Sequence, residues 1–161
     1  MFTMMKNTKK SMVLVAVILL ISGLALSGCL NGYDELELKE FKFVEDHDSM
    51  EEREPVYEDP HENVFMYLEV EGFEAEDEVV RWSVYVTARD PDGNVYDGID
   101  REEITNTSED IGGDWGVIES GPELTPPEEG WEEGENEVEI EVIDHVGEKN
   151  LIIEETFEVV L

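Results

Sequence analysis

Two stretches of this sequence alternate apolar and polar residues with a period of two, and this pattern restricts the fold more than any other feature. In the first stretch the apolar positions are Val80, Trp82, Val84, Val86 and Ala88, and the residues between them are Arg81, Ser83, Tyr85, Thr87 and Arg89. In the second stretch Val138, Ile140 and Val142 alternate with glutamates. Successive side chains of a β-strand point to opposite faces, whereas a helix repeats every 3.6 residues. The pattern therefore predicts an all-β protein.

Shorter apolar runs predict further strands, at residues 36–43, 64–70, 95–99, 115–119 and 151–161. In the first of these runs the alternation changes phase at Glu40, which indicates a β-bulge at that position. In the last run Phe157, Val159 and Leu161 are expected to close the sheet. Residues 101–111 are ambiguous, because their sequence suits either a strand or a short helical turn.

Residues with turn chemistry separate the predicted strands. Pro91 and Gly93 predict a turn over residues 90–94, and prolines mark residues 45–63 as a loop and residues 121–130 as a connection. About seven or eight short strands with polar turns, without an internal repeat or an amphipathic helix, predict an antiparallel β-sandwich. A small β-barrel is the alternative.

The C-terminal half resembles a prokaryotic immunoglobulin-like surface domain. The residues that carry the resemblance are Trp131, Gly134, Val138, Ile140, Val142, Asp144, Gly147, Lys149, Phe157 and Val159. The resemblance implies an immunoglobulin-like sandwich in which this segment forms the last two strands and Trp131 packs at the entry to the penultimate strand. Asn136 departs from the pattern, because an aromatic residue is common at this position. Such domains serve as spacers, adhesion modules and ligand binders, so the resemblance implies no particular activity.

The first 29 residues have the organisation of an export signal. Three lysines precede an apolar run from Met12 to Leu26, which ends in Leu26-Ser27-Gly28-Cys29. This ending resembles the lipobox of prokaryotic lipoproteins. The resemblance implies that Cys29 receives a diacylglyceryl group with palmitate-like chains and becomes the new N-terminus. The expected organisation is a signal helix at residues 1–28, a tether at 29–35 and the sandwich domain at 36–161.

Two other interpretations of this segment remain open. An uncleaved membrane anchor would use Met12–Gly28, whose 17 residues are at the lower limit of the ~17–25 that span a bilayer. A plain secretory signal with a chance cysteine is the second alternative. Lipidation is favoured because Cys29 is the only cysteine of the chain and cannot form an internal disulfide. Two acyl chains would also hold the protein on its membrane far better than one.

The chain is strongly acidic, with 43 Asp and Glu residues against 10 Lys and Arg residues and a formal net charge of −33. Removal of the signal with its three lysines would take this charge to −36. A phosphate backbone requires a basic surface, so a nucleic-acid partner is excluded. The acidity indicates either adaptation to high salt or a surface that collects cations. Salt adaptation is favoured because the acidic residues are spread along the whole domain.

Asp90, Asp92 and Asp97 are the candidates for a cation site. An EF-hand loop needs Gly at its sixth position, whereas here Gly93 is fourth and Pro91 intervenes. A hairpin turn is therefore the better interpretation, and weak calcium contacts by these aspartates are the alternative. The three histidines, His47, His61 and His145, have no metal-ligand spacing and are expected to be solvated loop residues.

No catalytic motif is present in the sequence. It contains no Gly-x-Ser-x-Gly, no glycine-rich phosphate loop and no second cysteine for thiol chemistry, so an enzyme and a bound cofactor are not expected. Asn106-Thr107-Ser108 is a glycosylation sequon in a predicted loop. The side chain of Trp82 is expected in the core. For Trp115 and Trp131 the core is favoured over an exposed ligand platform.

These features together predict a lipoprotein of the cell membrane that displays an acidic immunoglobulin-like sandwich on the extracytoplasmic face. Its expected partners are membrane lipid through Cys29 and envelope proteins or extracellular glycan. The loop at residues 45–63 and the turns are expected to form the contact surface. The alternatives are an accessory subunit of a transporter or surface complex, and a weak divalent-cation-binding module.

Overall fold

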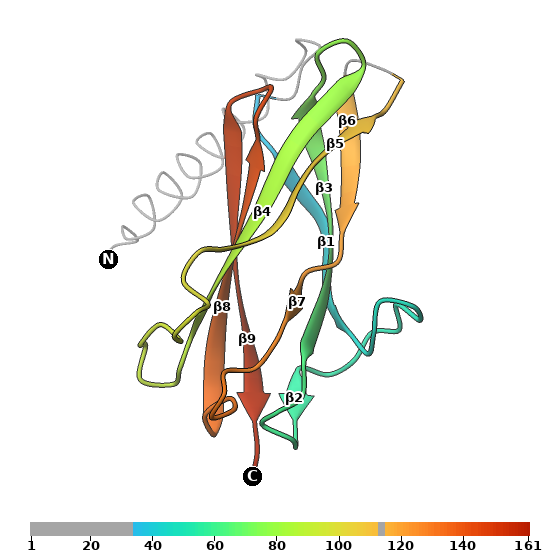
Figure 1. The fold of residues 1–161 in the computed structure, drawn as a ribbon. Coiled ribbons are helices and arrows are strands. Elements are labelled where there is room, and N and C mark those ends of the chain that lie inside the picture. The colour runs from blue at the N-terminus through green and yellow to red at the C-terminus, as the bar shows by residue number, and fades with distance from the viewer. Residues whose placement is uncertain (1–33, 113–114) are drawn as a thin grey trace, which may run out of the picture. The chain divides into compact units, whose positions relative to one another are not determined.

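Nine β-strands and no helix make up residues 34–112 and 115–161, the part of the chain that the computed structural model describes (Figure 1). The strands are β1 (Glu37–Val44), β2 (Val56–Tyr57), β3 (Val64–Glu74), β4 (Val79–Arg89), β5 (Glu102–Asp110), β6 (Trp115–Ser120), β7 (Glu123–Leu124), β8 (Gly134–Asp144) and β9 (Lys149–Val159). The predicted signal helix at residues 1–28 lies outside the described part. β2 and β7 have two residues each, and the other seven strands are longer.

The strands form two sheets. One sheet has the order β1-β3-β6, with β7 also paired to β3, and the other has the order β2-β9-β8-β4-β5. All pairs are antiparallel except β2 with β9, which is parallel. The prediction of an all-β, immunoglobulin-like sandwich is therefore confirmed. The alternative prediction of a small β-barrel is wrong, because the strands form two separate sheets that do not close into a barrel.

The alternating strands place their apolar residues between the two sheets. In β4 the side chains of Val80, Val84 and Val86 are fully buried, and Trp82 is 4% exposed. In β8 Val138, Ile140 and Val142 are buried while the glutamates between them face outward. Burial of one face per strand removes apolar surface from water and accounts for most of the stabilisation of a sandwich.

The register of β1 on β3 shifts between Leu38 and Glu40, which confirms the bulge predicted there. Beyond this point β1 turns Phe43 and Val44 into the core. Residues 101–111, which the sequence leaves ambiguous, form the edge strand β5. The extra strands β2 and β7 lie within the segments predicted as a loop and a connection.

The predicted strand at residues 95–99 is wrong. Only one bridge, between Arg89 and Val95, forms there. Tyr96 and Ile99 are nevertheless buried, and the Tyr96 amide donates to the carbonyl oxygen of Ala88 while the Ala88 amide donates to the carbonyl oxygen of Ile99. Leu161 does not close the sheet either, because β9 ends at Val159 and Leu161 is 74% exposed.

The turns gather at two ends of the sandwich (Figure 1). At the first, the tether end, residues 34–36 enter the domain beside Glu148–Ile152. At the second, the loop end, the segments 45–63, 90–101 and 121–133 meet the end of β9. The two ends are separated by the length of the 11-residue strands, about 35 Å at ~3.3 Å per residue.

Candidate contact surface at the loop end

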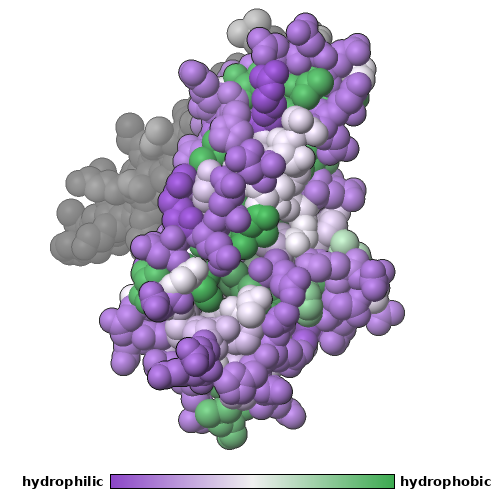
Figure 2. Space-filling view, viewed as in Figure 1, coloured by the Kyte–Doolittle hydropathy of each residue, from purple (hydrophilic) through white to green (hydrophobic). Residues whose placement is uncertain are grey.

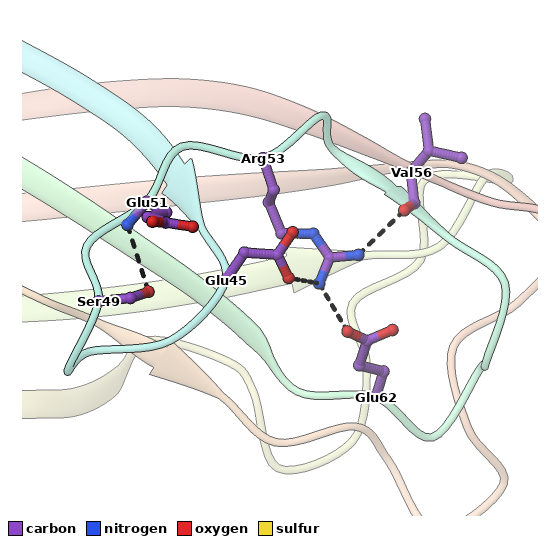
Figure 3. A network of polar contacts seen from close by, with 6 residues as sticks. All are labelled: Glu45, Ser49, Glu51, Arg53, Val56 and Glu62. Atoms are coloured by element: carbon purple, nitrogen blue, oxygen red, sulfur yellow. Dashed lines mark hydrogen bonds and ion pairs between the residues drawn. The ribbon is translucent and has the colours of Figure 1, made fainter.

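Arg53 joins separate parts of the loop at residues 45–63 to one another (Figure 3). Its Nη1 atom lies 2.6 Å from Glu62 Oε1 and 3.7 Å from Glu45 Oε2, and its Nη2 donates to the carbonyl oxygen of Val56 at 3.2 Å. The guanidinium lies over the ring of Tyr57 at 4.3 Å from the centroid. Because the Arg53 side chain is only 13% exposed, these contacts are partly shielded from water and hold the loop in one conformation.

The electrostatics of this cluster keep the Arg53 guanidinium charged and the Tyr57 hydroxyl protonated. Burial is the largest single effect and lowers the pKa of Arg53, but the hydrogen bond to Glu62 and the charge interactions with Tyr57, Glu62 and Glu45 together outweigh it, so the pKa of Arg53 is raised. Burial raises the pKa of Tyr57 to about 12. The Tyr57 hydroxyl is also buried and has no hydrogen-bond partner among the described residues. The cluster therefore organises the loop, and neither Arg53 nor Tyr57 exchanges protons near neutral pH.

Trp131 joins this loop to the segment that precedes β8. Its backbone amide donates to the carbonyl oxygen of Pro60 at 2.9 Å, and its Nε1 donates to the carbonyl oxygen of Glu62 at 3.0 Å. The ring packs edge-on against Tyr96 and Phe157 and is 2% exposed. The core interpretation of Trp131 is confirmed, as is that of Trp82, whereas the side chain of Trp115 lies outside the described part.

Tyr96 and Asn136 join the turn after β4 to the start of β8. The Tyr96 hydroxyl donates to Asn136 Oδ1 at 2.5 Å and accepts a hydrogen bond from the Glu132 amide at 2.9 Å. Asn136 Nδ2 donates to the carbonyl oxygens of Glu132 and Gly134 at 3.0 Å each. Asn136 is completely buried, and this network fills the place where the immunoglobulin-like pattern commonly has an aromatic residue.

A groove of about 810 Å³ lies beside this network. Tyr96, Trp131 and Leu161 line it together with the carboxylate residues Asp97, Glu128, Glu129, Glu132 and Glu133. No Lys or Arg lines the groove, so its field repels anionic ligands. The visible face of the domain is mostly hydrophilic, with hydrophobic residues in small separate groups (Figure 2).

The turn at residues 90–94 uses its first aspartate for its own structure. Asp90 Oδ1 accepts hydrogen bonds from the amides of Asp92 at 2.9 Å and Asn94 at 2.8 Å, and Asp90 Oδ2 accepts one from Asn94 Nδ2 at 2.9 Å. The hydrogen bond from the Asn94 side chain, together with the backbone amides, lowers the pKa of Asp90. Within residues 34–112 and 115–161, no group of three or more His, Cys, Asp or Glu residues could hold a metal ion. Cation contacts through Asp90, Asp92 and Asp97 stay a prediction.

The three histidines occupy different environments. His61 is exposed, as predicted. His47 is half-buried, packs edge-on against Phe65 and lies 3.8 Å from Glu123, so it belongs to the loop end rather than to bulk solvent. His145 is exposed, but its Nε2 lies 2.7 Å from the hydroxyl of the buried Ser83. This serine–histidine contact joins residues 62 positions apart, and no local sequence signal indicates it.

Asn106 lies in β5, not in the predicted loop. It is exposed, pairs with Ser83 of β4 in the register of the sheet, and its Nδ2 donates to Glu103 at 3.3 Å. β5 is an edge strand, so Asn106 has a neighbouring strand on one side only. Glycosylation at Asn106 stays a prediction.

Cys29, the predicted lipid attachment site, lies outside the described residues. The described ranges contain no helix that is long and apolar enough to cross a membrane.

A family profile described as a domain of unknown function (DUF3110) matches residues 56–128, which is less than half of the chain and stops short of β8 and β9. No curated protein matches the sequence.

Two solved structures of Bacteroides uniformis β-glucuronidases are among the similar folds. β-Glucuronidase 2, covalently bound to cyclophellitol-6-carboxylate aziridine, has a TM-score of 0.37 and 11% identity over 77% of this chain. A second β-glucuronidase has a TM-score of 0.36 and 12% identity over 77% of this chain. This chain covers only 12% of either enzyme's length. At TM-scores below 0.5, these similarities support no inference about activity.

Proposed function

We propose that this protein is a lipoprotein of the extracytoplasmic membrane face, anchored through Cys29, and that its sandwich acts as a binding or structural module. The observation that carries the proposal is the lipobox-like Leu26-Ser27-Gly28-Cys29, which follows an apolar run and precedes the folded domain by a few residues. A lipidated cysteine at this place would tether the domain through a short linker.

The contact surface of the module is the loop end, and its partners are envelope proteins or extracellular glycan. Three segments meet there: Trp131 and Tyr96 fix them to one another, and Arg53 orders the loop at residues 45–63 from within. A surface that is already ordered loses little conformational entropy when it binds. The acidity of the domain favours a role in a salt-rich environment and argues against nucleic acid as a partner.

The distribution of exposed apolar residues favours a free-standing module over an accessory subunit. A subunit that depends on a partner is expected to expose one contiguous apolar patch. Of the large apolar side chains exposed in the described part, Val56, Val160 and Leu161 lie near the end of β9, and the other four lie on separate loops and strands, namely Met50, Val95, Val117 and Ile152. The domain is therefore expected to fold and remain monomeric by itself.

Crosslinking in native cells tests this role. After crosslinking, the full-length protein is purified from membranes and the attached molecules are identified by mass spectrometry, with the Cys29→Ser variant as the control for anchoring. Diffuse recovery of envelope proteins or glycan supports the free-standing module. One stoichiometric membrane complex would overturn it in favour of an accessory subunit.

A further inference from the structure

The position at which the chain enters the sandwich restricts how an anchored domain can stand on a membrane. Asp34, Glu35 and Leu36 lie beside Glu148–Ile152, at the start of β9. From there β1 and β9 run along the domain in the direction of the loop end, where β9 finishes beside Tyr57 (Figure 1). The tether therefore joins the domain at the end opposite to Arg53, Trp131 and Tyr96.

The length of the tether is short compared with the domain. Seven residue steps separate Cys29 from Leu36, which at most ~3.6 Å per residue span about 25 Å. The strands between the two ends add about 35 Å. We infer that the anchored protein keeps its tether end next to the membrane and presents its loop end outward, about 35–60 Å from the lipid surface. This inference depends on the lipid anchor of the proposed function.

Charge favours the upright orientation over one in which the domain lies on the membrane. The tether restrains one end only, while carboxylates cover the loop end, including those of the acidic groove. Anionic headgroups repel these carboxylates over a distance of about 10 Å at 0.1 M salt. Repulsion at the unrestrained end therefore turns that end away from the bilayer, and a partner meets the loop end first.

Strand β9 offers labelling positions at increasing distances from the tether end, and these can test the orientation. Asn150, Glu154 and Glu158 are all exposed, lie on the same face of one strand, and are separated by four residues each, or about 13 Å per step. Their side chains make none of the hydrogen bonds or ion pairs described above. Because Cys29 is the only cysteine and its thiol would carry the lipid, a cysteine introduced at one of these positions is the only free thiol.

The experiment uses full-length Asn150→Cys, Glu154→Cys and Glu158→Cys, each labelled with the same donor fluorophore. The lipidated proteins are reconstituted into phosphatidylglycerol vesicles that carry acceptor-labelled lipid. Energy transfer to the lipid surface is expected to decrease stepwise from position 150 to 154 to 158. The melting temperature of each labelled variant is compared with that of the wild type to confirm that the fold is intact.

The outcomes separate the orientation from the anchor. Equal transfer from all three positions would mean that the domain lies flat, and increasing transfer towards position 158 would mean that the loop end faces the lipid; either result overturns the inference while the anchor stands. Absence of transfer from every position, with protein that does not float with the vesicles, would overturn the anchor itself and the orientation with it.

Discussion

The carboxylate of Asp144 on β8 accepts a hydrogen bond from the backbone amide of Glu74 on β3 at 2.8 Å, and so joins the two sheets at the tether end. Its other oxygen accepts hydrogen bonds from the amides of Val146 and Gly147 at 3.0 Å each. Lys149 Nζ lies 3.1 Å from a carboxylate oxygen of Glu74 on the same side. Asp144 is completely buried, and the three amides that donate to it belong to partly buried residues.

Replacement of Asp144 is therefore expected to destabilise the domain. Asp144→Ala leaves three partly buried amides without their acceptor and is expected to lower the free energy of unfolding by about 1–3 kcal/mol. Asp92→Ala is the matched control, because the Asp92 side chain is exposed and makes no hydrogen bond described here; its effect is expected to stay within about 0.5 kcal/mol. Urea denaturation measures both. Equal midpoints for the two variants would show that the inter-sheet hydrogen bond contributes nothing.

The two buried tyrosines are expected to respond in opposite ways to loss of the hydroxyl. Tyr96→Phe removes the partner of Asn136 Oδ1 and of the Glu132 amide, and is expected to cost about 1–3 kcal/mol of unfolding free energy. Tyr57→Phe removes a buried hydroxyl that has no partner, so it is expected to be neutral or stabilising. The same chemical change thus tests both environments by urea denaturation. A larger loss for Tyr57→Phe than for Tyr96→Phe would contradict the hydrogen bonding described here.

The raised pKa of Tyr57 also predicts how the free energy of unfolding changes at alkaline pH. Its pKa is raised by burial to about 12 in the folded state, against about 10 in the unfolded chain. The unfolded state then loses this proton first, so the contribution of Tyr57 to stability is complete below about pH 10 and is lost as the pH rises towards about 12. Unfolding free energies measured across this range should fall less steeply for Tyr57→Phe than for the wild type. Identical slopes would mean that Tyr57 ionises normally.

The salt dependence of the melting temperature is expected to arise in part from like charges that face each other on neighbouring strands. Glu69 of β3 lies directly opposite Glu40 of β1 on one side and Glu119 of β6 on the other, on the outer face of the sheet. Such pairs repel, and salt screens them. The wild-type melting temperature should rise from low to molar NaCl, and Glu69→Gln should raise it at low salt and reduce its dependence on salt.

Glu58→Gln is the control for this prediction, because it removes the same charge from an exposed loop residue that lies outside the paired strands. If both variants shift the melting curve equally at low salt, the effect comes from net charge alone. A wild-type melting temperature that does not change with salt would contradict salt adaptation altogether.

The strands that can be predicted from the sequence are those that bury one face. The alternation in β4 and β8 exists because Val84 and Ile140 must face the core while their neighbours face water. β5 has no such pattern, because it is an edge strand in which only Ile104 and Thr105 are partly buried. Two residues cannot show a period, so β2 is invisible in the sequence although Tyr57 is completely buried.

The organisation of the loop end depends on contacts between distant parts of the chain. Trp131 donates to Glu62 across 69 positions, and Tyr96 donates to Asn136 across 40 positions. The buried amide of Asn136 interrupts an apolar face, and that interruption is the only local signal of a polar network. The role of Arg53 has no motif either, because several glutamates near it in sequence are equally plausible partners and only the fold selects Glu62 and Glu45.

The most direct test of the lipoprotein proposal is the mass and the membrane association of the protein from its native cells, compared between the wild type and Cys29→Ser. If the protein is a lipoprotein, we expect the wild type in the membrane fraction as a chain that begins at Cys29 and carries acyl groups. Cys29→Ser should be released or should keep its signal unprocessed. A Cys29→Ser protein that stays in the membrane with unchanged mass would contradict the lipid anchor, and with it the proposed function.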